Sequence, residues 1–377
     1  MAAAVSTFTF WLSIGALAYT FVGYSALMAW LARGRKIARH ALPGDPPEVC
    51  VVVVAHNEEA RIGARIENLL ASDYPPEKLR VLLVSDGSTD DTAARARAFD
   101  PKRVTVLAQP IRAGKAAGLN ATLAVATGEI VVFTDARQRF APDAIARLAT
   151  HFADPRIGAV SGSLEIEAAS SAAGAGVDAY WRMEKALRSD ESRFDSCIGC
   201  TGAIYAIRRA LFAPIPADTL LDDVVIPMQI AAGGARVIHD SEAIAFDPQT
   251  LEPASELRRK QRTLAGNFQM LFRHPAWLLP WRHRLWWQLL SHKYLRLAAP
   301  IFLVTAFTAN VTLAAHPIFR ATLAGQIAFY AAAALGLAMR SRRLRVLSLP
   351  AGFVFLNVMA VRGFIYFLIH RDRSGWR

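Results

Sequence analysis

The sequence predicts an α/β domain built on a parallel sheet, with apolar helices attached at both of its ends. Long uncharged apolar runs are concentrated at the two ends of the 377-residue chain. Between them, short β-branched runs alternate with stretches of helical spacing, which is typical of a doubly wound parallel sheet. Polar motifs follow several of these runs, at the strand ends where such sheets bind ligands. Together these patterns indicate a soluble α/β domain held at a membrane by its two ends.

The first element is an apolar run from Phe8 to Leu31 that carries no charge. It is long enough to span a bilayer. A cleavable signal peptide would instead have basic residues before a shorter apolar core. Here the basic residues follow the run, at Arg33, Arg35, Lys36 and Arg39. By the positive-inside rule this places the following domain in the cytoplasm, as in a bacterial inner-membrane protein. We assign residues 1–36 to an N-terminal transmembrane helix.

A turn-rich linker, Pro43 to Pro47, precedes the α/β region. The expected strands are Val49–Val54, Val81–Val84, Val104–Leu107 and Ile130–Thr134, and the expected helices are Ala60–Leu70 and Ala116–Ala126. The first strand is a continuous β-branched run, as expected for a strand buried on both faces. We assign residues 42–255 to this domain.

The region after residue 255 changes character. Glu256–Phe272 is basic and has helical spacing, and Trp277–Lys293 is rich in Trp, Arg and His. That composition suits a helix in the lipid headgroup layer, and an amphipathic core helix is the alternative. We therefore assign residues 256–296 to basic, interfacial helices. Residues 297–377 form a C-terminal transmembrane region with three apolar segments, Leu297–Ala315, Ile318–Met339 and Val346–Ile369.

The course of the last apolar segment is left open by its flanking charges. If Arg340, Arg342, Arg343 and Arg345 are cytoplasmic, a full final span would place Arg371 and Arg373 outside. Pro350 and Arg362 within the segment also permit a re-entrant or interfacial course.

The net charge of +12 is compatible with nucleic acid or with anionic lipid. Nucleic-acid binders usually spread basic residues along one face among aromatics. Here they cluster beside apolar segments, so we expect membrane lipids as partners and no nucleic acid. Cys197 and Cys200 form a lone C-x-x-C without a second pair, which argues against a zinc site. With Cys50, they are expected to be reduced thiols without chemistry.

The polar motifs at successive strand ends carry the functional information. They are Ala55-His56-Asn57-Glu58-Glu59, Ser85-Asp86-Gly87-Ser88-Thr89-Asp90-Asp91, the Arg112–Asn120 loop, and Thr134-Asp135-Ala136-Arg137. Farther on come Gly199-Cys200-Thr201-Gly202-Ala203, Leu221-Asp222-Asp223 and Arg258–Arg262. Gly114-Lys115 lacks the full P-loop signature, and no G-x-G-x-x-G follows the first strand. A P-loop ATPase and a dinucleotide enzyme are therefore disfavoured.

From about Val49 to Asn267 the order of these motifs resembles the family-2 glycosyltransferases, which have the Rossmann-like GT-A fold. The apolar flanks resemble the membrane-integrated branch to which cellulose- and hyaluronan-synthase-like enzymes belong. This resemblance implies transfer of a sugar from a nucleotide sugar, expected to be a UDP-sugar, in cell-envelope or exopolysaccharide synthesis. The acceptor implied is membrane-associated, such as a polyprenyl-diphosphate-linked glycan or a glycolipid.

The resemblance also assigns roles to residues. Ala55, Asn57, Glu58 and Asp86 lie where family members hold the base and ribose, and Lys115 would place a cation near the diphosphate. Asp135 matches the first aspartate of the family's D-x-D, which binds Mg²⁺ or Mn²⁺, and Arg137 stands at its second acid.

The resemblance further implies which residues act on the acceptor. Asp223 matches the general base that activates the acceptor hydroxyl for direct, inverting displacement, and Asp222 would orient Asp223 or the acceptor. A helix N-cap with an acidic first turn is the structural alternative for this pair. We assign Gly199, Cys200, Thr201, Gly202 and Arg262 to acceptor binding.

Two departures from the family pattern qualify the prediction. Because Arg137 replaces an acid, its charge could partly substitute for that of the metal, or another group could complete the ion's shell. The Q-x-x-R-W of processive synthases is reduced to its arginine, Arg262, so a non-processive enzyme is expected. A polymerising synthase that exports its product, and a catalytically degenerate scaffold in an envelope-glycan complex, are the alternatives.

Overall fold

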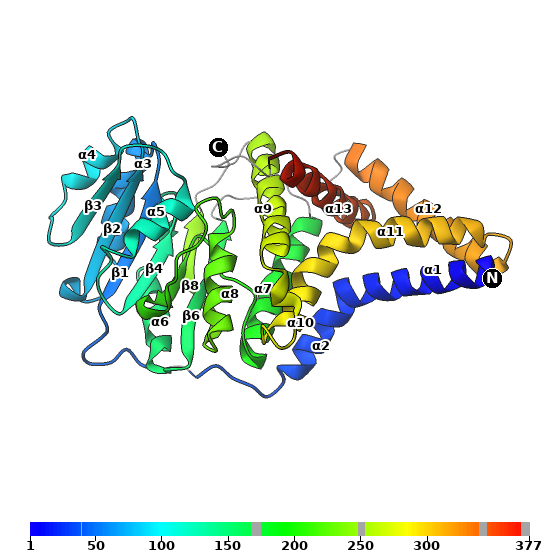
Figure 1. Cartoon of the computed structure of the whole chain (residues 1–377), viewed down its shortest axis with the longest axis horizontal. Coiled ribbons are helices and arrows are strands. Elements are labelled where there is room, and N and C mark those ends of the chain that lie inside the picture. The colour runs from blue at the N-terminus through cyan, green and yellow to red at the C-terminus, as the bar shows by residue number, and fades with distance from the viewer. Residues whose placement is uncertain (39, 167–174, 248–252, 339–344, 371–377) are drawn as a thin grey trace.

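The computed structural model describes residues 1–38, 40–166, 175–247, 253–338 and 345–370. It consists of an α/β domain and a bundle of long apolar helices that extends away from it, with the N-terminus at the far end of the bundle (Figure 1). The domain contains one sheet of 8 strands in the order β3-β2-β1-β4-β7-β6-β8-β5. The predicted α/β fold class with flanking apolar helices is therefore confirmed.

The first half of the sheet is parallel, as the sequence predicts. It contains β1 (Val49–Ala55), β2 (Leu79–Asp86), β3 (Val104–Gln109) and β4 (Ile130–Thr134). β1 lies between β2 and β4, with Val49 opposite Leu79 on one side and Ile130 on the other. The order in which the strands are added therefore changes direction at β1: β2 and β3 lie on one side of it, and β4 lies on the other. Parallel α/β sheets commonly bind ligands at such a point, between the carboxyl ends of the two strands, here β1 and β4.

The second half of the sheet corrects the expectation of a wholly parallel arrangement. It contains β5 (Arg139–Phe140), β6 (Ile157–Ile166), β7 (Tyr205–Arg208) and β8 (Arg236–Asp247). β7 runs antiparallel to both β4 and β6, and β5 runs antiparallel to β8. Only β6 and β8 pair in parallel, with two register shifts. The sheet is therefore mixed.

Alternating residues of β1 divide the core into two layers, because successive strand side chains point to opposite faces. Val49, Val51 and Val53 pack with α3 (Glu59–Leu70), α4 (Thr92–Arg97) and α6 (Ala144–Thr150). Cys50 and Val52 belong to the other layer, with α5 (Lys115–Thr122), α8 (Asp222–Ala232) and α9 (Pro253–Arg273). Short 3-10 helices cover Pro76–Lys78, His151–Ala153, Arg209–Leu211 and Pro275–Leu278. All three cysteines are buried free thiols.

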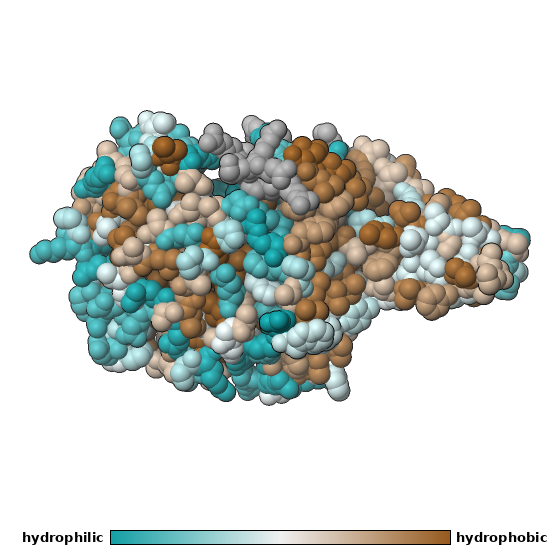
Figure 2. All heavy atoms as spheres, viewed as in Figure 1, coloured by the Kyte–Doolittle hydropathy of each residue, from teal (hydrophilic) through white to brown (hydrophobic). Residues whose placement is uncertain are grey.

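Four helices of the described chain are long and apolar enough to cross a membrane. The first is continuous over Ala2–Leu31, formed by α1 (Ala2–Ala18), the π-helical turn η1 (Tyr19–Gly23) and α2 (Tyr24–Leu31). The others contain α11 (Leu295–Thr312), α12 (Pro317–Ala338) and α13 (Arg345–His370). Apolar side chains gather over this helical part, and polar ones over the sheet domain (Figure 2). The four predicted apolar segments are confirmed as helices.

The segment Trp277–Lys293, predicted as interfacial, has an exposed first part and a buried second part. The second candidate span already begins at Trp286, because α10 (Trp286–Leu289) and the π-helical turn η6 (Leu290–Tyr294) continue into α11. His292 in η6 is fully buried between Glu184 and Glu191 of α7 (Ala175–Phe194). This half of the segment packs against the α/β domain, as the core-helix alternative expects. Trp281, before α10, is 75% exposed.

The basic flanks at Arg39, Arg340, Arg342, Arg343, Arg371 and Arg373 lie outside the described residues. α13 is a single helix through Pro350 and Arg362. Its C-terminal half lies close against α9, where a Cβ on Gly363 would come within 2.5 Å of Leu264 Cβ. The last apolar segment is thus partly covered by a helix of the basic region.

Candidate active site

A cavity of about 930 Å³ lies at the carboxyl ends of β1 and β4. The residues that line it come from the strand ends, from the amino end of α8, from α7 and from α9. The predicted site residues that line it are Ala55, Glu58, Lys115, Asp135, Arg137, Cys200, Thr201, Gly202, Asp222, Asp223 and Arg262. Motifs that are far apart in the sequence are thus brought to one hollow, as the strand-end pattern predicts.

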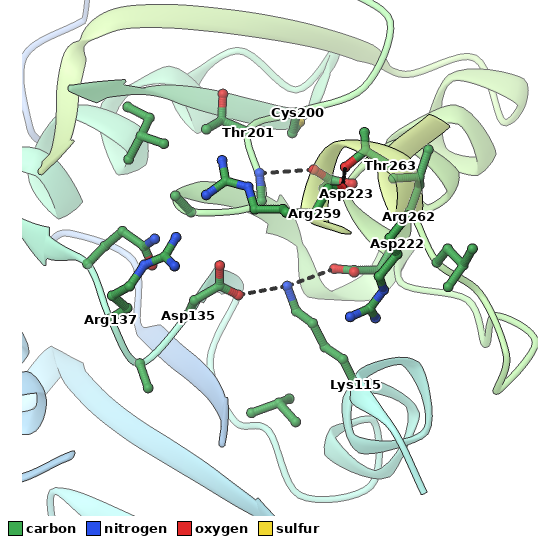
Figure 3. Close-up of a pocket in the computed structure, with 18 of the residues that line it drawn as sticks. Lys115, Asp135, Arg137, Cys200, Thr201, Asp222, Asp223, Arg259, Arg262 and Thr263 are labelled. Carbon is green, nitrogen blue, oxygen red and sulfur yellow. Dashed lines mark hydrogen bonds and ion pairs between the residues drawn. The ribbon is translucent and has the colours of Figure 1, made fainter. Parts of the chain in front are cut away.

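Lys115 connects the two acidic motifs of the cavity. From the start of α5 its Nζ lies 2.9 Å from Asp135 Oδ1 and 3.4 Å from Asp222 Oδ2 (Figure 3). Burial alone would lower the pKa of Lys115, but the charges of Asp135 and Asp222 raise it above its ordinary value. For Asp135, burial acts upward and Lys115 outweighs it, so the pKa is lowered. A cation and a carboxylate are therefore both ionised at this end of the cavity.

Asp86 and Asn57 act on the loops around the cavity and are not among the residues that line it. Both oxygens of the buried Asp86 carboxylate accept backbone N–H groups, from Ala113 at 2.6 Å and Gly114 at 2.8 Å. Asn57 has a φ of 55° and its Oδ1 accepts the Thr89 N–H at 2.9 Å. These bonds fix the loop that leads into Lys115 and join the β1 and β2 loops. Their predicted contact with the nucleotide stays a prediction.

Arg137 does not reach Asp135 in an ion pair of its own. Its Nη2 lies 2.9 Å from Asp247 Oδ2, at the end of β8, and its side chain is 29% exposed on the cavity wall. Asp247 is buried, so its carboxylate needs this partner. The guanidinium still lies beside Asp135 in the hollow (Figure 3). Arg137 can therefore add positive charge to the cavity, but its orientation is set by Asp247.

Asp135 is the residue of the cavity that fits a divalent cation bound together with substrate. The described residues contain no group of three His, Cys, Asp or Glu side chains suited to hold a metal. Asp135, however, is 42% exposed towards the cavity. Mg²⁺ is commonly held by one or two carboxylates together with substrate phosphates and water. Asp135 fits that role for an ion that arrives with a diphosphate.

Asp223 lies at the first turn of α8, where the helix dipole favours negative charge. Its Oδ2 accepts the Gly202 N–H at 3.1 Å, and its backbone oxygen accepts the Cys200 N–H at 2.7 Å. Burial, followed by the charge of Asp222, raises the pKa of Asp223, and Lys115 and Arg188 act in the opposite direction. A carboxylate with a raised pKa is a better proton acceptor, provided that it remains ionised.

Gly202 is required by the close approach of Asp223, since a Cβ there would come within 2.9 Å of Asp223 Oδ2. We expect Gly202→Ala to displace the carboxylate and lower kcat of the reaction at this site by about tenfold or more, because small misplacements of reacting groups are costly. The matched control is Gly63→Ala in α3, where no atom lies within 4 Å of the added Cβ. Steady-state kinetics and thermal unfolding of both variants make the comparison. Unchanged kcat in Gly202→Ala would contradict this account of the glycine.

The residues assigned to acceptor binding occupy two walls of the cavity. Cys200 is buried and Thr201 is half-buried next to Gly202, whereas Gly199 is not among the lining residues. Arg262 is exposed on α9, on the opposite wall, with Thr263 beside it. Figure 3 shows both projecting from the helix towards the acidic motifs. The cavity therefore has a second side, away from Lys115, that is open to another molecule.

Several lining residues were not among the predicted site residues. They are His56, Arg61, Gln138, Ser163, Glu184, Lys185, Arg188, His239, Arg259 and Thr263. Those on α7 belong to a charged amphipathic helix, which in sequence is typical of a solvated surface. The sequence feature that could have indicated them is the spacing Glu184-Lys185-x-x-Arg188, which puts two cations on one helical face.

Comparison with known proteins agrees with this geometry. Residues 50–215 match the model of "Glycosyl transferase family 2". The chain is 29% identical over 297 residues to an N-acetylglucosaminyltransferase of Rhizobium meliloti. This match covers 71% of this chain and 67% of the relative. It is 34% identical over 155 residues to a beta-monoglucosyldiacylglycerol synthase of Nostoc, covering 40% of this chain and 33% of the relative. The chain thus spans only about a third of that second relative.

A solved structure covers almost the whole chain. It is the mannosyltransferase PcManGT from Pyrobaculum calidifontis, in complex with GDP-Man and Mn²⁺. The match has a TM-score of 0.74 and 25% identity, and it covers 99% of this chain and 100% of that one. The likeness therefore includes the apolar helices as well as the α/β domain.

Proposed function

We propose that this chain is a family 2 glycosyltransferase of the GT-A fold and that it transfers a sugar, with inversion, from a nucleotide sugar to a membrane-associated acceptor. The observation that carries the proposal is the convergence of Lys115, Asp135, Asp222 and Asp223 on one cavity. Lys115 supplies a positive charge for a diphosphate, Asp135 supplies a carboxylate that could hold a divalent cation there, and Asp223 supplies a carboxylate of raised pKa.

In this mechanism the donor diphosphate lies against Lys115, and the sugar extends towards α8. Asp223 takes the proton of an acceptor hydroxyl as that oxygen attacks the anomeric carbon, and the nucleoside diphosphate leaves from the opposite side. One displacement inverts the configuration and requires no enzyme nucleophile. A divalent cation bound by Asp135 would neutralise charge on the leaving diphosphate. Asp222 lies 3.4 Å from Lys115, so it contacts the lysine in addition to its predicted role of orienting Asp223 or the acceptor.

The acceptor and donor classes are proposed from chemistry and from relatives. One relative is named a glucosyldiacylglycerol synthase, and four helices here suit a bilayer, so a glycolipid or polyprenyl-linked glycan is the acceptor we propose. We propose a UDP-sugar as donor, with the α/β domain (residues 42–255) in the cytoplasm. PcManGT holds GDP-Man, so any donor screen should include it. The loss of Q-x-x-R-W around Arg262 supports addition of single sugars.

The test is direct. Purified protein in lipid micelles is incubated with UDP-sugars and GDP-mannose and with a membrane lipid extract, and nucleoside diphosphate release is measured. We expect release that depends on the extract, with one sugar added per lipid acceptor. Long polymeric products would favour the processive alternative, and failure to bind any nucleotide sugar would favour a degenerate scaffold.

The raised pKa of Asp223 predicts a pH dependence. The base must be ionised, so kcat should fall as pH drops through this pKa. The Arg188 cation lowers the pKa of Asp223, so Arg188→Gln should raise it and move the acid limb of the kcat profile to higher pH. Arg182→Gln, on an exposed part of the same helix, is the control and should leave the limb in place. A limb that stays unmoved in Arg188→Gln would argue against Asp223 as the titrating base.

A further inference from the structure

One wall of the cavity has polar groups that the proposed donor chemistry does not use. It is formed by α7 and β8 and presents Lys185, Arg188 and His239. Lys185 and Arg188 are three residues apart and so lie on one face of α7. The Nη1 group of Arg188 donates to Thr201 Oγ1 at 3.0 Å, which places this wall next to the loop that holds Asp223.

His239 is a buried side chain whose ring is not fully bonded. It is 5% exposed, and neither ring nitrogen forms a hydrogen bond of normal geometry in the described part of the chain, although the Ser161 backbone lies near enough to raise its pKa. Burial, and then the charge of Arg188, lowers the pKa of His239 to about 4. The ring is therefore neutral at pH 7, with one nitrogen able to donate and the other to accept. Buried polar groups are normally paired, so a ligand in the cavity is a natural partner.

Arg188 also has a hydrogen-bond donor without an acceptor, because the carboxylate of its neighbour Glu184 is bonded to other side chains. Glu184 accepts from His292 Nε2 at 2.8 Å and from Arg296 Nη1 at 2.8 Å. Arg188 Nε is 3.5 Å from Glu184 and has no hydrogen-bond partner in the described chain. The carboxylate of Glu184 is thus held by the η6–α11 segment, and Arg188, which lines the cavity, keeps a buried Nε group without a hydrogen bond.

Charge in this region is unbalanced. Glu191, the second carboxylate on this side of α7, accepts from Tyr24 at 2.6 Å and from His292 Nδ1 at 2.9 Å. On this side of α7 and on the η6–α11 segment that packs on it, the cationic side chains Lys185, Arg188, Lys293 and Arg296 outnumber the carboxylates near them, which are Glu184, Glu191 and the Asp223 that acts on Arg188. Positive charge withdrawn from water is costly unless it is neutralised. An anionic ligand would neutralise it.

We propose that Lys185, Arg188 and His239 form a subsite for a phosphate group of the acceptor. The inference rests on the proposed function and names its acceptor class as a phosphate- or diphosphate-bearing lipid. Three separately placed donors match the oxygens of a phosphate better than the two oxygens of a carboxylate. α7 lies between the sheet and the apolar helices (Figure 1), so a lipid chain can remain among those helices. A hydroxyl near the phosphate then reaches Asp223 past Thr201 and Gly202.

The experiment compares two lipids that differ only in the phosphate. Thermal unfolding of the full chain in nonionic micelles is followed by tryptophan fluorescence with polyprenyl phosphate, with the polyprenol of equal length, and with soluble glycerol 3-phosphate. We expect polyprenyl phosphate alone to raise Tm, by mass action. The shift should fall by at least half in Lys185→Gln and in His239→Gln, and should persist in Arg182→Gln, a charge-matched change on the exposed part of α7.

Equal shifts with the phosphate and the alcohol, or a full shift in both Lys185→Gln and His239→Gln, would overturn the subsite. An equal shift with glycerol 3-phosphate would keep the phosphate site and assign it to a soluble acceptor. The proposed function is tested separately by nucleoside diphosphate release. A protein that shows the phosphate-specific shift but never releases nucleotide would fail as a transferase and keep the subsite.

Discussion

Replacement of Asp223 by asparagine is expected to lower kcat for sugar transfer by roughly 100- to 10,000-fold, the usual contribution of a general base. Asparagine keeps the size of the side chain and can still accept the Gly202 N–H, but it cannot take a proton. Donor binding should remain, because Lys115 and Asp135 are unchanged. Kinetics with saturating donor and titration calorimetry with the nucleotide sugar separate the two effects.

Asp73→Asn is the matched control for this substitution. Asp73 is exposed, and the same chemical change there should leave kcat unaltered. A further control is the stability of the variant. Because the pKa of Asp223 is raised, its ionised form is disfavoured in the folded protein, so a neutral asparagine should not reduce Tm. Normal turnover in Asp223→Asn would remove this residue as the base.

Lys115→Met should weaken nucleotide-sugar binding by roughly 10- to 100-fold, as expected for loss of a charge-assisted contact to a diphosphate. The change also leaves Asp135 and Asp222 without their shared cation, and their charges would then repel the diphosphate. The expected signature is a raised KM for the donor, in contrast to the kcat effect at Asp223.

Calorimetry of donor binding, with and without Mn²⁺, measures the effect of Lys115→Met. Lys115→Arg should recover part of the affinity, because it restores the cation. Lys102→Met, at an exposed position at the other edge of the sheet, is the control. Unaltered donor affinity in Lys115→Met would show that the diphosphate binds elsewhere in the cavity.

The parallel half of the fold could be predicted because each of its strands is recognisable from its own residue pattern. β1 is a run of β-branched residues buried on both faces, and a polar motif begins where the run ends. The same holds for β2 and β4, so Lys115 and Asp135 could be expected at one edge of the sheet. β6 could not be read in the same way. Its sequence, Ile157–Ile166, mixes glycine and serine with apolar residues, and β7 has only 4 residues.

The remaining site features depend on contacts between distant segments. Arg137 pairs with Asp247, 110 residues away, and nothing local to either residue signals the contact. Asp86 is engaged by the Ala113 and Gly114 backbone, a role that the motif alone did not suggest. Arg188 likewise depends on how η6 packs against α7 and occupies Glu184. Long-range pairing of this kind becomes visible only once the sheet and helices are assembled.

The central claim is that this membrane-associated domain moves sugar from a nucleotide to a lipid by means of Asp223. It is tested most directly with radiolabelled nucleotide sugar and a membrane lipid extract. With the unmodified protein, label should enter the organic phase in equal amount with the nucleoside diphosphate released, and Asp223→Asn should give neither. Absence of lipid-bound label for every UDP- and GDP-sugar, or equal labelling by Asp223→Asn, would contradict the account.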